Sequence, residues 1–284
     1  MPWTMEPIAR LEASKRHASG LAFSPDGRTL ATGGMEGALR VWRVKDWTLS
    51  EEVPGHKASV NSIDATGTGW VTAGSDKTLR VWKKDWQAVE TIPGYVACAP
   101  VHGALVARKD RGDRLYRHDL KEGKATAAAA TGLDRLHGPW STPAGVAVAG
   151  MSPVVQLRDP DDLGLLAALD GHGVAATSVS CTYDGRTLAV ADASGRLHLW
   201  DLQDRARVAN VPLGRKGYFF AAISPDGRLV ATAGEGVVGL FTVAGEPVWT
   251  NEPGIKGLYG LAWSPNGRHL ANAASDGKVR VWKV

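Results

Sequence analysis

The 284-residue sequence predicts an all-β fold, a seven-bladed β-propeller with four-stranded antiparallel blades. Two markers recur together at intervals of about 40 residues, which is the length of one blade. The first marker is a turn glycine, found at Gly27, Gly67, Gly103, Gly145, Gly185, Gly227 and Gly267. The second is the residue that ends the third strand of each unit, found at Trp42, Trp82, His118, Arg158, Trp200, Phe241 and Trp282. Because the two series agree, we expect seven repeats that occupy nearly the whole chain.

The segment from Gly20 to Trp42 shows the repeating unit most clearly. Its apolar stretches at 21–23, 29–32 and 39–42 are separated by two reversals. In the first reversal, Pro25 fixes φ, Asp26 can accept a hydrogen bond from the backbone, and Gly27 allows a positive φ. The second reversal, at 33–37, is rich in glycine. The unit is therefore predicted to be a three-stranded meander.

We predict a single domain, residues 1–284, with blades at approximately 13–53, 54–92, 93–130, 131–169, 170–212, 213–250 and 251–284. The last unit ends with its third strand, whereas residues 6–12 are strand-like and precede the first unit. We therefore expect residues 6–12 to pair into the last blade as its outer strand. This pairing would close the ring and remove an exposed sheet edge.

Some segments outside the meanders are also informative. Residues 45–53 and 84–92 are near copies of each other and are predicted to be outer strands, with Trp47 and Trp86 at the blade rim. The region 94–160 is the least regular, and its alanine-rich stretch 126–131 fits a strand, a loop or a helix. Blades three and four therefore depart furthest from the repeat, through relaxed selection or because a partner docks there.

Composition and motifs argue against several classes of function. The 33 basic and 29 acidic residues give a net charge of +4, which is too small to indicate nucleic-acid binding by itself. Cys98 and Cys181 lie in different repeats and lack the spacing of a metal site. The sequence has no P-loop, nucleophile elbow, zinc-protease motif or calcium loop. We therefore expect no enzyme activity, no catalytic residue, no cofactor and no metal.

The chain start lacks the pattern of a signal peptide, and no apolar run reaches the roughly 18 residues of a membrane span. We expect a cytoplasmic protein without membrane insertion. The alanine-, glycine- and arginine-rich composition, with near-identical Ser-Pro-Asp-Gly-Arg turns, suggests a bacterial source.

These repeats resemble the WD40 family. The resemblance rests on the Trp200-Asp201 pair, the Gly-His pairs Gly55-His56 and Gly171-His172, and seven copies in register. In that family, a buried network of His, Ser or Thr, Asp and Trp ties each blade together. The resemblance assigns this structural network to His17, Thr32, Glu36 and Trp42 in the first repeat, His56, Thr72, Asp76 and Trp82 in the second, His172 and Trp200 in the fifth, and Asp276 and Trp282 in the seventh.

The resemblance also implies a partner-binding face. In WD40 proteins, the loop before each first strand and the loop between the second and third strands form one face around the central channel. The corresponding residues here are Met35, Lys57, Ser59, Lys77, Tyr95, Arg108, Lys109, Arg111, His137, Trp140, Val174, Lys216, Tyr218, Lys256 and Tyr259. Within Tyr218-Phe219-Phe220, the two phenylalanines cannot both face inward from one strand.

Three functions remain open. The favoured hypothesis is a non-catalytic scaffold or adaptor that binds one or more proteins or peptides within a larger assembly. The alternative is recognition of an anionic partner, nucleic acid or a phosphorylated or acidic peptide, by a basic rim made of Lys57, Lys77, Arg108, Lys109, Arg111, Lys216 and Lys256. A propeller enzyme is the least favoured, because the loops supply mostly Lys, Ala and Gly.

Overall fold

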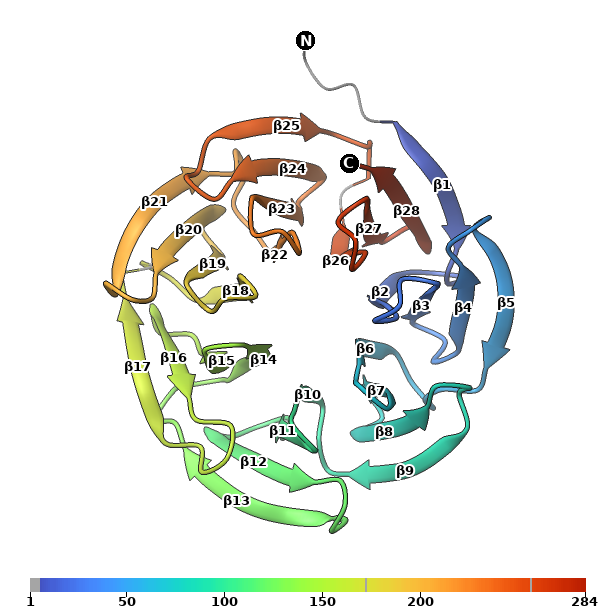
Figure 1. Cartoon of the computed structure of the whole chain (residues 1–284), viewed down its shortest axis with the longest axis horizontal. Coiled ribbons are helices and arrows are strands. Elements are labelled where there is room, and N and C mark those ends of the chain that lie inside the picture. Colours follow the sequence, from blue (N-terminus) through green and yellow to red (C-terminus); the bar gives the residue numbers. More distant parts are fainter. Residues whose placement is uncertain (1–5, 172, 256) are drawn as a thin grey trace.

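The computed structural model describes residues 6–171, 173–255 and 257–284. Seven four-stranded antiparallel sheets stand in a ring around a central channel, and the chain passes from blade to blade in order (Figure 1). The described residues contain no helix. The predicted seven-bladed β-propeller is thus confirmed.

Each blade is a meander that runs from the channel outward. Blades 1 to 3 comprise β2 (Ala18–Phe23), β3 (Thr29–Gly34), β4 (Leu39–Arg43) and β5 (Thr48–Val53); β6 (Val60–Ala65), β7 (Gly69–Gly74), β8 (Thr78–Lys83) and β9 (Ala88–Pro93); and β10 (Ala97–Val101), β11 (Ala104–Arg108), β12 (Arg114–Asp119) and β13 (Lys124–Ala130). Blades 4 and 5 comprise β14 (His137–Thr142), β15 (Gly145–Ala149), β16 (Val154–Arg158) and β17 (Leu165–Asp170); and β18 (Ala176–Cys181), β19 (Thr187–Asp192), β20 (Arg196–Asp201) and β21 (Ala206–Pro212). Blade 6 comprises β22 (Phe219–Ile223), β23 (Leu229–Gly234), β24 (Val237–Thr242) and β25 (Pro247–Asn251). Blade 7 comprises β26 (Leu258–Trp263), β27 (His269–Ala274), β28 (Lys278–Lys283) and β1 (Pro7–Glu12).

The two ends of the described chain meet in blade 7. Strand β1 pairs antiparallel with β28 from Pro7 opposite Trp282 to Glu12 opposite Lys278, with a register shift between Pro7 and Ala9. The Lys278 Nζ atom lies 2.8 Å from Glu12 Oε1 at the end of this pairing. The prediction that residues 6–12 close the ring is confirmed, and the outer edge of β28 is covered as expected.

The hydrophobic core lies between the blades. Each of the seven buried clusters combines side chains of two neighbouring blades, because each sheet is apolar on both faces. The cluster between blades 7 and 1 contains Leu11 of β1 together with Phe23, Leu30 and Trp42. Ring closure therefore completes a hydrophobic interface as well as a sheet.

The recurring turn motif is explained by its hydrogen bonds. In blade 1, the Ser24 hydroxyl donates to Asp26 Oδ1 at 2.6 Å and accepts from the Thr29 N–H at 3.0 Å. Gly27 has φ of 68°, which disfavours any residue with a side chain. The same pattern joins Thr182 to Asp184, Ser224 to Asp226 and Ser264 to Asn266. Four blades thus share one turn.

The irregular region forms complete blades. Alanine-rich β13 is the outer strand of blade 3. Of the strand, loop and helix that fitted the sequence 126–131, the strand is the one found. Phe219 is fully buried between blades 5 and 6, whereas Phe220 lines the central channel. At the rim of blade 2, Trp86 is buried and stacks on Trp70 with ring centroids 4.7 Å apart.

Leu11→Ala should lower the free energy of unfolding by about 2–5 kcal/mol, because Leu11 is only 3% exposed and its truncation leaves a cavity between blades 7 and 1. Urea denaturation measures this change. Ile8→Ala on the same strand is the control, since Ile8 is 47% exposed and should change the free energy by less than about 0.5 kcal/mol. If Leu11→Ala lowered the free energy of unfolding no more than Ile8→Ala does, the burial of Leu11 would contribute little to the stability of ring closure.

Candidate functional site

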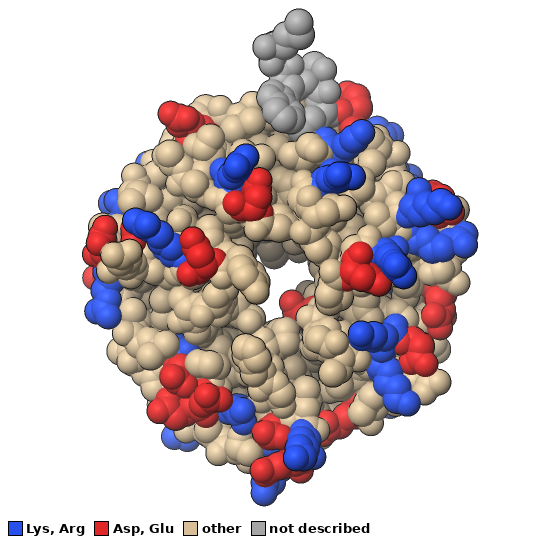
Figure 2. Space-filling view, in the orientation of Figure 1, with Lys and Arg blue, Asp and Glu red and all other residues tan. Residues whose placement is uncertain are grey.

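Two sets of loops form one end of the ring. The leading loops precede the first strand of each blade, and the second-to-third-strand loops lie beside them, because alternate reversals of a meander fall at the same end. We call this end of the ring the channel face. The central channel has a volume of about 740 Å³, and all seven innermost strands contribute to its wall. Figure 2 looks along the channel onto one end of the ring, where the opening is surrounded mostly by uncharged residues and basic and acidic residues are intermixed farther out.

In blade 2, all four residues assigned to the structural network are joined. His56 Nε2 lies 2.8 Å from Thr72 Oγ1, which also accepts the Trp82 indole N–H at 3.0 Å. The other ring nitrogen of His56 lies 3.0 Å from Asp76 Oδ1. Asp76 Oδ2 accepts the Lys57 N–H at 2.9 Å. The network therefore ties the leading loop to the second-to-third-strand loop, and it fixes the backbone of the channel face in this blade.

The pKa values of this network follow from its hydrogen bonds. Burial by itself would raise the pKa of Asp76, but hydrogen bonds from the Lys57 N–H, the Thr78 hydroxyl and the His56 ring outweigh it and lower the pKa to about 2. Burial lowers the pKa of His56, more than the adjacent Asp76 raises it. The folded blade thus favours an ionised Asp76 and a neutral His56.

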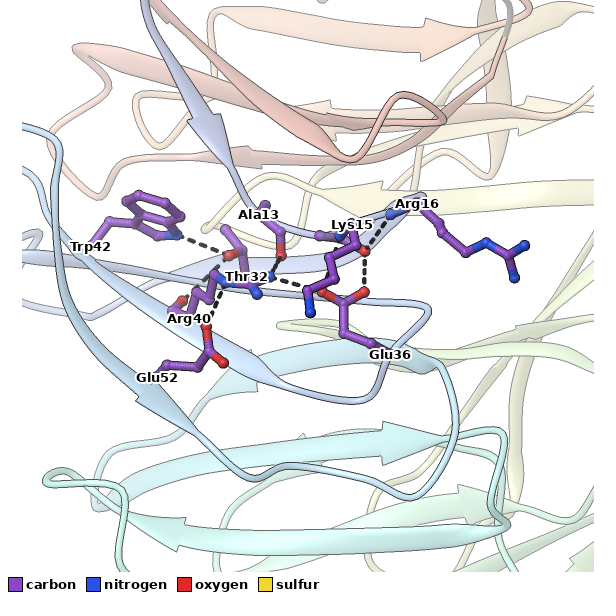
Figure 3. Close-up of polar contacts among 9 residues, drawn as sticks. Ala13, Lys15, Arg16, Thr32, Glu36, Arg40, Trp42 and Glu52 are labelled. Atoms are coloured by element: carbon purple, nitrogen blue, oxygen red, sulfur yellow. Dashed lines mark hydrogen bonds and ion pairs between the residues drawn. The ribbon is translucent and has the colours of Figure 1, made fainter.

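Blade 1 joins its leading loop to its second-to-third-strand loop through different residues (Figure 3). The Trp42 indole donates to Thr32 Oγ1 at 2.9 Å, as in blade 2. Glu36 accepts from the Arg40 guanidinium at 2.9 Å and from the Lys15 N–H at 3.1 Å, and it also bonds the Ser14 hydroxyl. Arg40 reaches the Ala13 carbonyl at 2.7 Å. These bonds lower the pKa of Glu36 to about 2 against the opposing effect of burial.

The assignment of His17 to this network is wrong. The residue in the position of His56 is Ser14, three residues earlier, since Lys15 bonds Glu36 as Lys57 bonds Asp76. His17 is half-buried instead, and its ring packs edge-on against Tyr259 with centroids 5.6 Å apart. The likeness of the local sequence to a Gly-His repeat was too low to fix the register of this loop.

The remaining network residues vary further. In blade 7, Asp276 pairs with Arg280 at 2.8 Å, and the Trp282 indole donates to Asn272 at 3.1 Å. In blade 5, Trp200 is buried, and His198 lies 2.7 Å from Asp192 in a buried pair that the sequence did not reveal. His172, assigned to the same blade, lies outside the described residues, as does Lys256 of the predicted partner-binding face.

The structure places the predicted face residues in three different environments. Tyr95 is buried against the ring of Tyr116, so its assignment to the partner-binding surface is wrong. Arg108 donates from Nε to the Gly138 carbonyl at 2.8 Å, and His137 donates from Nδ1 to the Ala176 carbonyl at 2.8 Å. Ser59, Arg108, His137 and Trp140 are half-buried, and Trp140 lines the channel. The exposed residues are Met35, Lys57, Lys77, Lys109, Arg111, Val174, Lys216, Tyr218 and Tyr259.

The exposed cations gather over blades 2 and 3, but part of their charge is already compensated. Lys77 Nζ lies 3.3 Å from Asp110, and Lys109 Nζ lies 4.9 Å from the centre of the Tyr116 ring. Burial lowers the pKa of Arg108, and the bond to the Gly138 carbonyl makes its guanidinium a structural donor. We call the residues Lys57, Lys77, Lys109, Asp110 and Arg111 the charged sector.

Exposed apolar side chains stand on the channel face in the other five blades, beside charged residues such as Lys216. Met35 and Met151 stand on second-to-third-strand loops of blades 1 and 4, where the N–H groups of both bond a leading loop. Val174, Tyr218 and Tyr259 belong to the leading loops or first strands of blades 5, 6 and 7. Tyr218 is 60% exposed and Tyr259 is 42% exposed. We call these five residues the apolar arc; the sequence analysis had not singled out Met151.

The channel wall holds further polar groups that the sequence analysis did not assign. Asp64 of β6 lines the channel, and its burial raises the pKa of this carboxyl to about 6. Cys98 and Cys181 are free thiols in the same wall, and burial raises the pKa of both. Among the described residues, no three His, Cys, Asp or Glu side chains are grouped to hold a metal ion, and no helix could cross a membrane.

Asp76→Asn should lower the free energy of unfolding at pH 7 by about 1–3 kcal/mol, because it disrupts buried hydrogen bonds of the network. In the wild type, the pKa of Asp76 falls from 3.8 to about 2 on folding. The unfolded chain then takes up this proton first, so the contribution of Asp76 is complete above pH ~4 and is lost toward pH ~2.

Urea denaturation between pH 2 and pH 7 tests this, and the variant should show a flatter acid limb. Asp85→Asn is the matched control, since Asp85 is an exposed carboxylate of the same blade. An acid limb as steep in Asp76→Asn as in the wild type would contradict the assignment.

Comparison with known proteins agrees with this geometry. The family described as "WD domain, G-beta repeat" matches residues 5–43, 47–83, 164–201 and 246–283, together more than half of the chain. Most of blades 3, 4 and 6 lie outside these matches. These are the blades in which the network signature is weakest.

Several relatives align along most of this chain. It is 23% identical to THO complex subunit 3 of Arabidopsis thaliana, over 93% of this chain and 89% of that protein. It is 22% identical to nuclear distribution protein nudF of Aspergillus niger (98% and 63%) and 25% identical to WD repeat-containing protein 1-B of Xenopus laevis (91% and 38%). The chain thus spans less than two thirds of the latter two relatives. The repeat matches, the seven four-stranded blades and the networks of blades 1 and 2 agree: the chain belongs to the WD40 repeat family.

Proposed function

We propose that this protein is a non-catalytic interaction scaffold, a subunit of a larger assembly that docks a partner protein on its channel face. The observation that carries the proposal is the apolar arc. Five exposed apolar side chains from five blades lie at one end of the ring, on loops or at the start of a first strand, and the N–H groups of Met35 and Met151 bond the adjacent leading loops. Rigid loops lose little entropy on binding, which favours their use as a docking surface.

The two tyrosines are the expected anchors of this surface. Tyrosine combines a large apolar ring with a polar end, and it is enriched among the residues that dominate binding energy. Tyr259 also lies at the channel wall and packs against His17, which restricts its ring before a partner arrives. The name of the relative THO complex subunit 3 describes a subunit of a complex, and it supports the same role here.

The charged sector supports a second candidate, recognition of an acidic protein segment or nucleic acid. Lys57 and Arg111 are exposed and have no ion-pair partner among the described residues. The pairing of Lys77 with Asp110 weakens this candidate, because it lowers the positive potential over blades 2 and 3. We therefore place docking on the apolar arc first.

The scaffold role includes two further proposals. No catalytic function is assigned, since the His, Thr, Asp and Trp residues of the blade networks serve structural hydrogen bonds. A cytoplasmic location fits the two free cysteines, because secreted proteins more often use cysteines in disulfides.

The double variant Tyr218→Ala, Tyr259→Ala should lose its partner by at least roughly tenfold, since truncation of an anchoring aromatic residue commonly costs more than about 1 kcal/mol. Affinity capture from an extract of the source cells, followed by a binding titration with the recovered partner, measures this loss. Recovery should persist at high salt, because the contact is mainly apolar.

Tyr183→Ala is the matched control. Tyr183 is 89% exposed, but it lies on the loop between β18 and β19, at the opposite end of the ring. A partner that is washed away by salt and lost in Lys57→Ala, Lys77→Ala would instead support the charged sector. A partner retained by the tyrosine double variant and lost in Tyr183→Ala would refute docking on the channel face.

A further inference from the structure

One position in the third strand carries a large polar residue in every blade except blade 6. It lies two residues before the bulky residue that ends the strand, opposite the position of Thr32 in β3. The residues found there are Arg40, Arg80, Tyr116, Gln156, His198, Gly239 and Arg280. Six blades therefore place a large polar side chain at this point, and blade 6 places glycine.

The large side chains fill the space beneath the leading loop. Arg40 donates to the Ala13 carbonyl at 2.7 Å, and Gln156 donates to the Thr131 carbonyl at 3.0 Å. Tyr116 packs its ring against Tyr95, with centroids 5.6 Å apart. In each case, a side chain with an apolar stem or ring occupies the space between the blade and its leading loop.

In blade 6 this space is a pocket of about 690 Å³. Gly239 and Thr232 lie in its wall together with the apolar side chains of Leu213, Val237, Phe241 and Pro247. The charged residues of its wall, Arg215 and Glu252, pair with each other at 2.9 Å. The pocket has the size and the apolar character of a small-molecule site, and its charges compensate each other.

The pocket wall also contains a hydroxyl group, that of Thr232. Thr232 is 1% exposed, and its side chain has no hydrogen-bond partner among the described residues. A Cβ atom added to Gly239 would lie 2.8 Å from the Phe241 ring and 3.0 Å from Thr232 Oγ1, so the ring edge and the hydroxyl lie side by side over the glycine. The corresponding Thr32 and Thr72 accept an indole N–H at 2.9 and 3.0 Å, whereas Phe241 of blade 6 has no N–H to donate. A ligand that supplies an N–H or O–H donor would give the Thr232 hydroxyl the kind of partner that Thr32 and Thr72 have.

We propose that the pocket beneath the leading loop of blade 6 binds an uncharged aromatic group that carries one N–H or O–H donor, with the donor bonded to Thr232 Oγ1. The apolar wall selects the ring, the compensated charges disfavour a charged ligand, and Thr232 selects the donor. The group is a free small molecule or the side chain of a partner; both share this chemistry. The inference does not depend on the docking proposed for the channel face.

Indole is the first probe, and 1-methylindole, which lacks the N–H, is its partner compound. Ligand-observed NMR titrations with the intact chain should show saturable binding of indole, and roughly five- to tenfold weaker binding of 1-methylindole. Thr232→Val should bind indole as weakly as the wild type binds 1-methylindole, and it should no longer distinguish the two compounds. This variant should fold normally, because the hydroxyl that it removes makes no bond.

Thr250→Trp tests the location, since Thr250 is exposed at the pocket wall opposite Gly239 on β25. It should abolish indole binding, whereas Thr91→Trp, at the same register of blade 2, should leave binding unchanged. N-acetyl-tryptophanamide distinguishes the two sources: binding as tight as that of indole indicates a side chain, and exclusion indicates a free small molecule. Failure of the wild type to bind indole up to its solubility limit, equal binding of the two compounds, or binding that survives Thr250→Trp would overturn the proposal.

Discussion

The burial of both faces of every sheet against its neighbours is the constraint on which this structure depends. A single four-stranded blade leaves two apolar faces in water, and a row of blades leaves one at each end. Only a closed ring covers all of them, and here the last interface contains Leu11 of β1 beside Trp42 of blade 1. The pairing of β1 with β28 is therefore both the final sheet contact and the final hydrophobic contact.

Within that constraint, different side chains solve one local problem. Each leading loop must be held against the neighbouring second-to-third-strand loop. Blade 2 uses His56 and Asp76, and blade 1 uses Ser14 and Glu36 with Arg40; in blade 7 the Ser275 N–H bonds the Gly257 carbonyl, and Asp276 pairs with Arg280. The chemistry differs, but in each blade a carboxylate accepts a charged or buried donor. In blade 6 a two-residue turn and Gly239 remove this arrangement, and a pocket takes its place.

The fold was predictable because its signals are local. A turn such as Ser24 to Asp26 is stabilised within a few residues, so its motif survives in the sequence and its spacing counts the blades. The site was less predictable, since it depends on contacts between segments. The burial of Tyr95 depends on Tyr116, which is about one hairpin away, and the leading loops differ in length, which displaced His17 from its expected role. The exceptional glycine at position 239 becomes visible only when the strand registers of all blades are compared.

Ring closure also has a consequence for synthesis. Strand β1 is made first and its partner β28 is made last, because Glu12 pairs with Lys278. At ordinary translation speeds the interval is on the order of tens of seconds, during which the edge of β1 has no partner and blade 7 cannot form. The propeller is therefore completed only after translation of β28. Until then, β1 of one nascent chain can pair with β28 of another, so crowded polysomes favour exchange of this strand between copies.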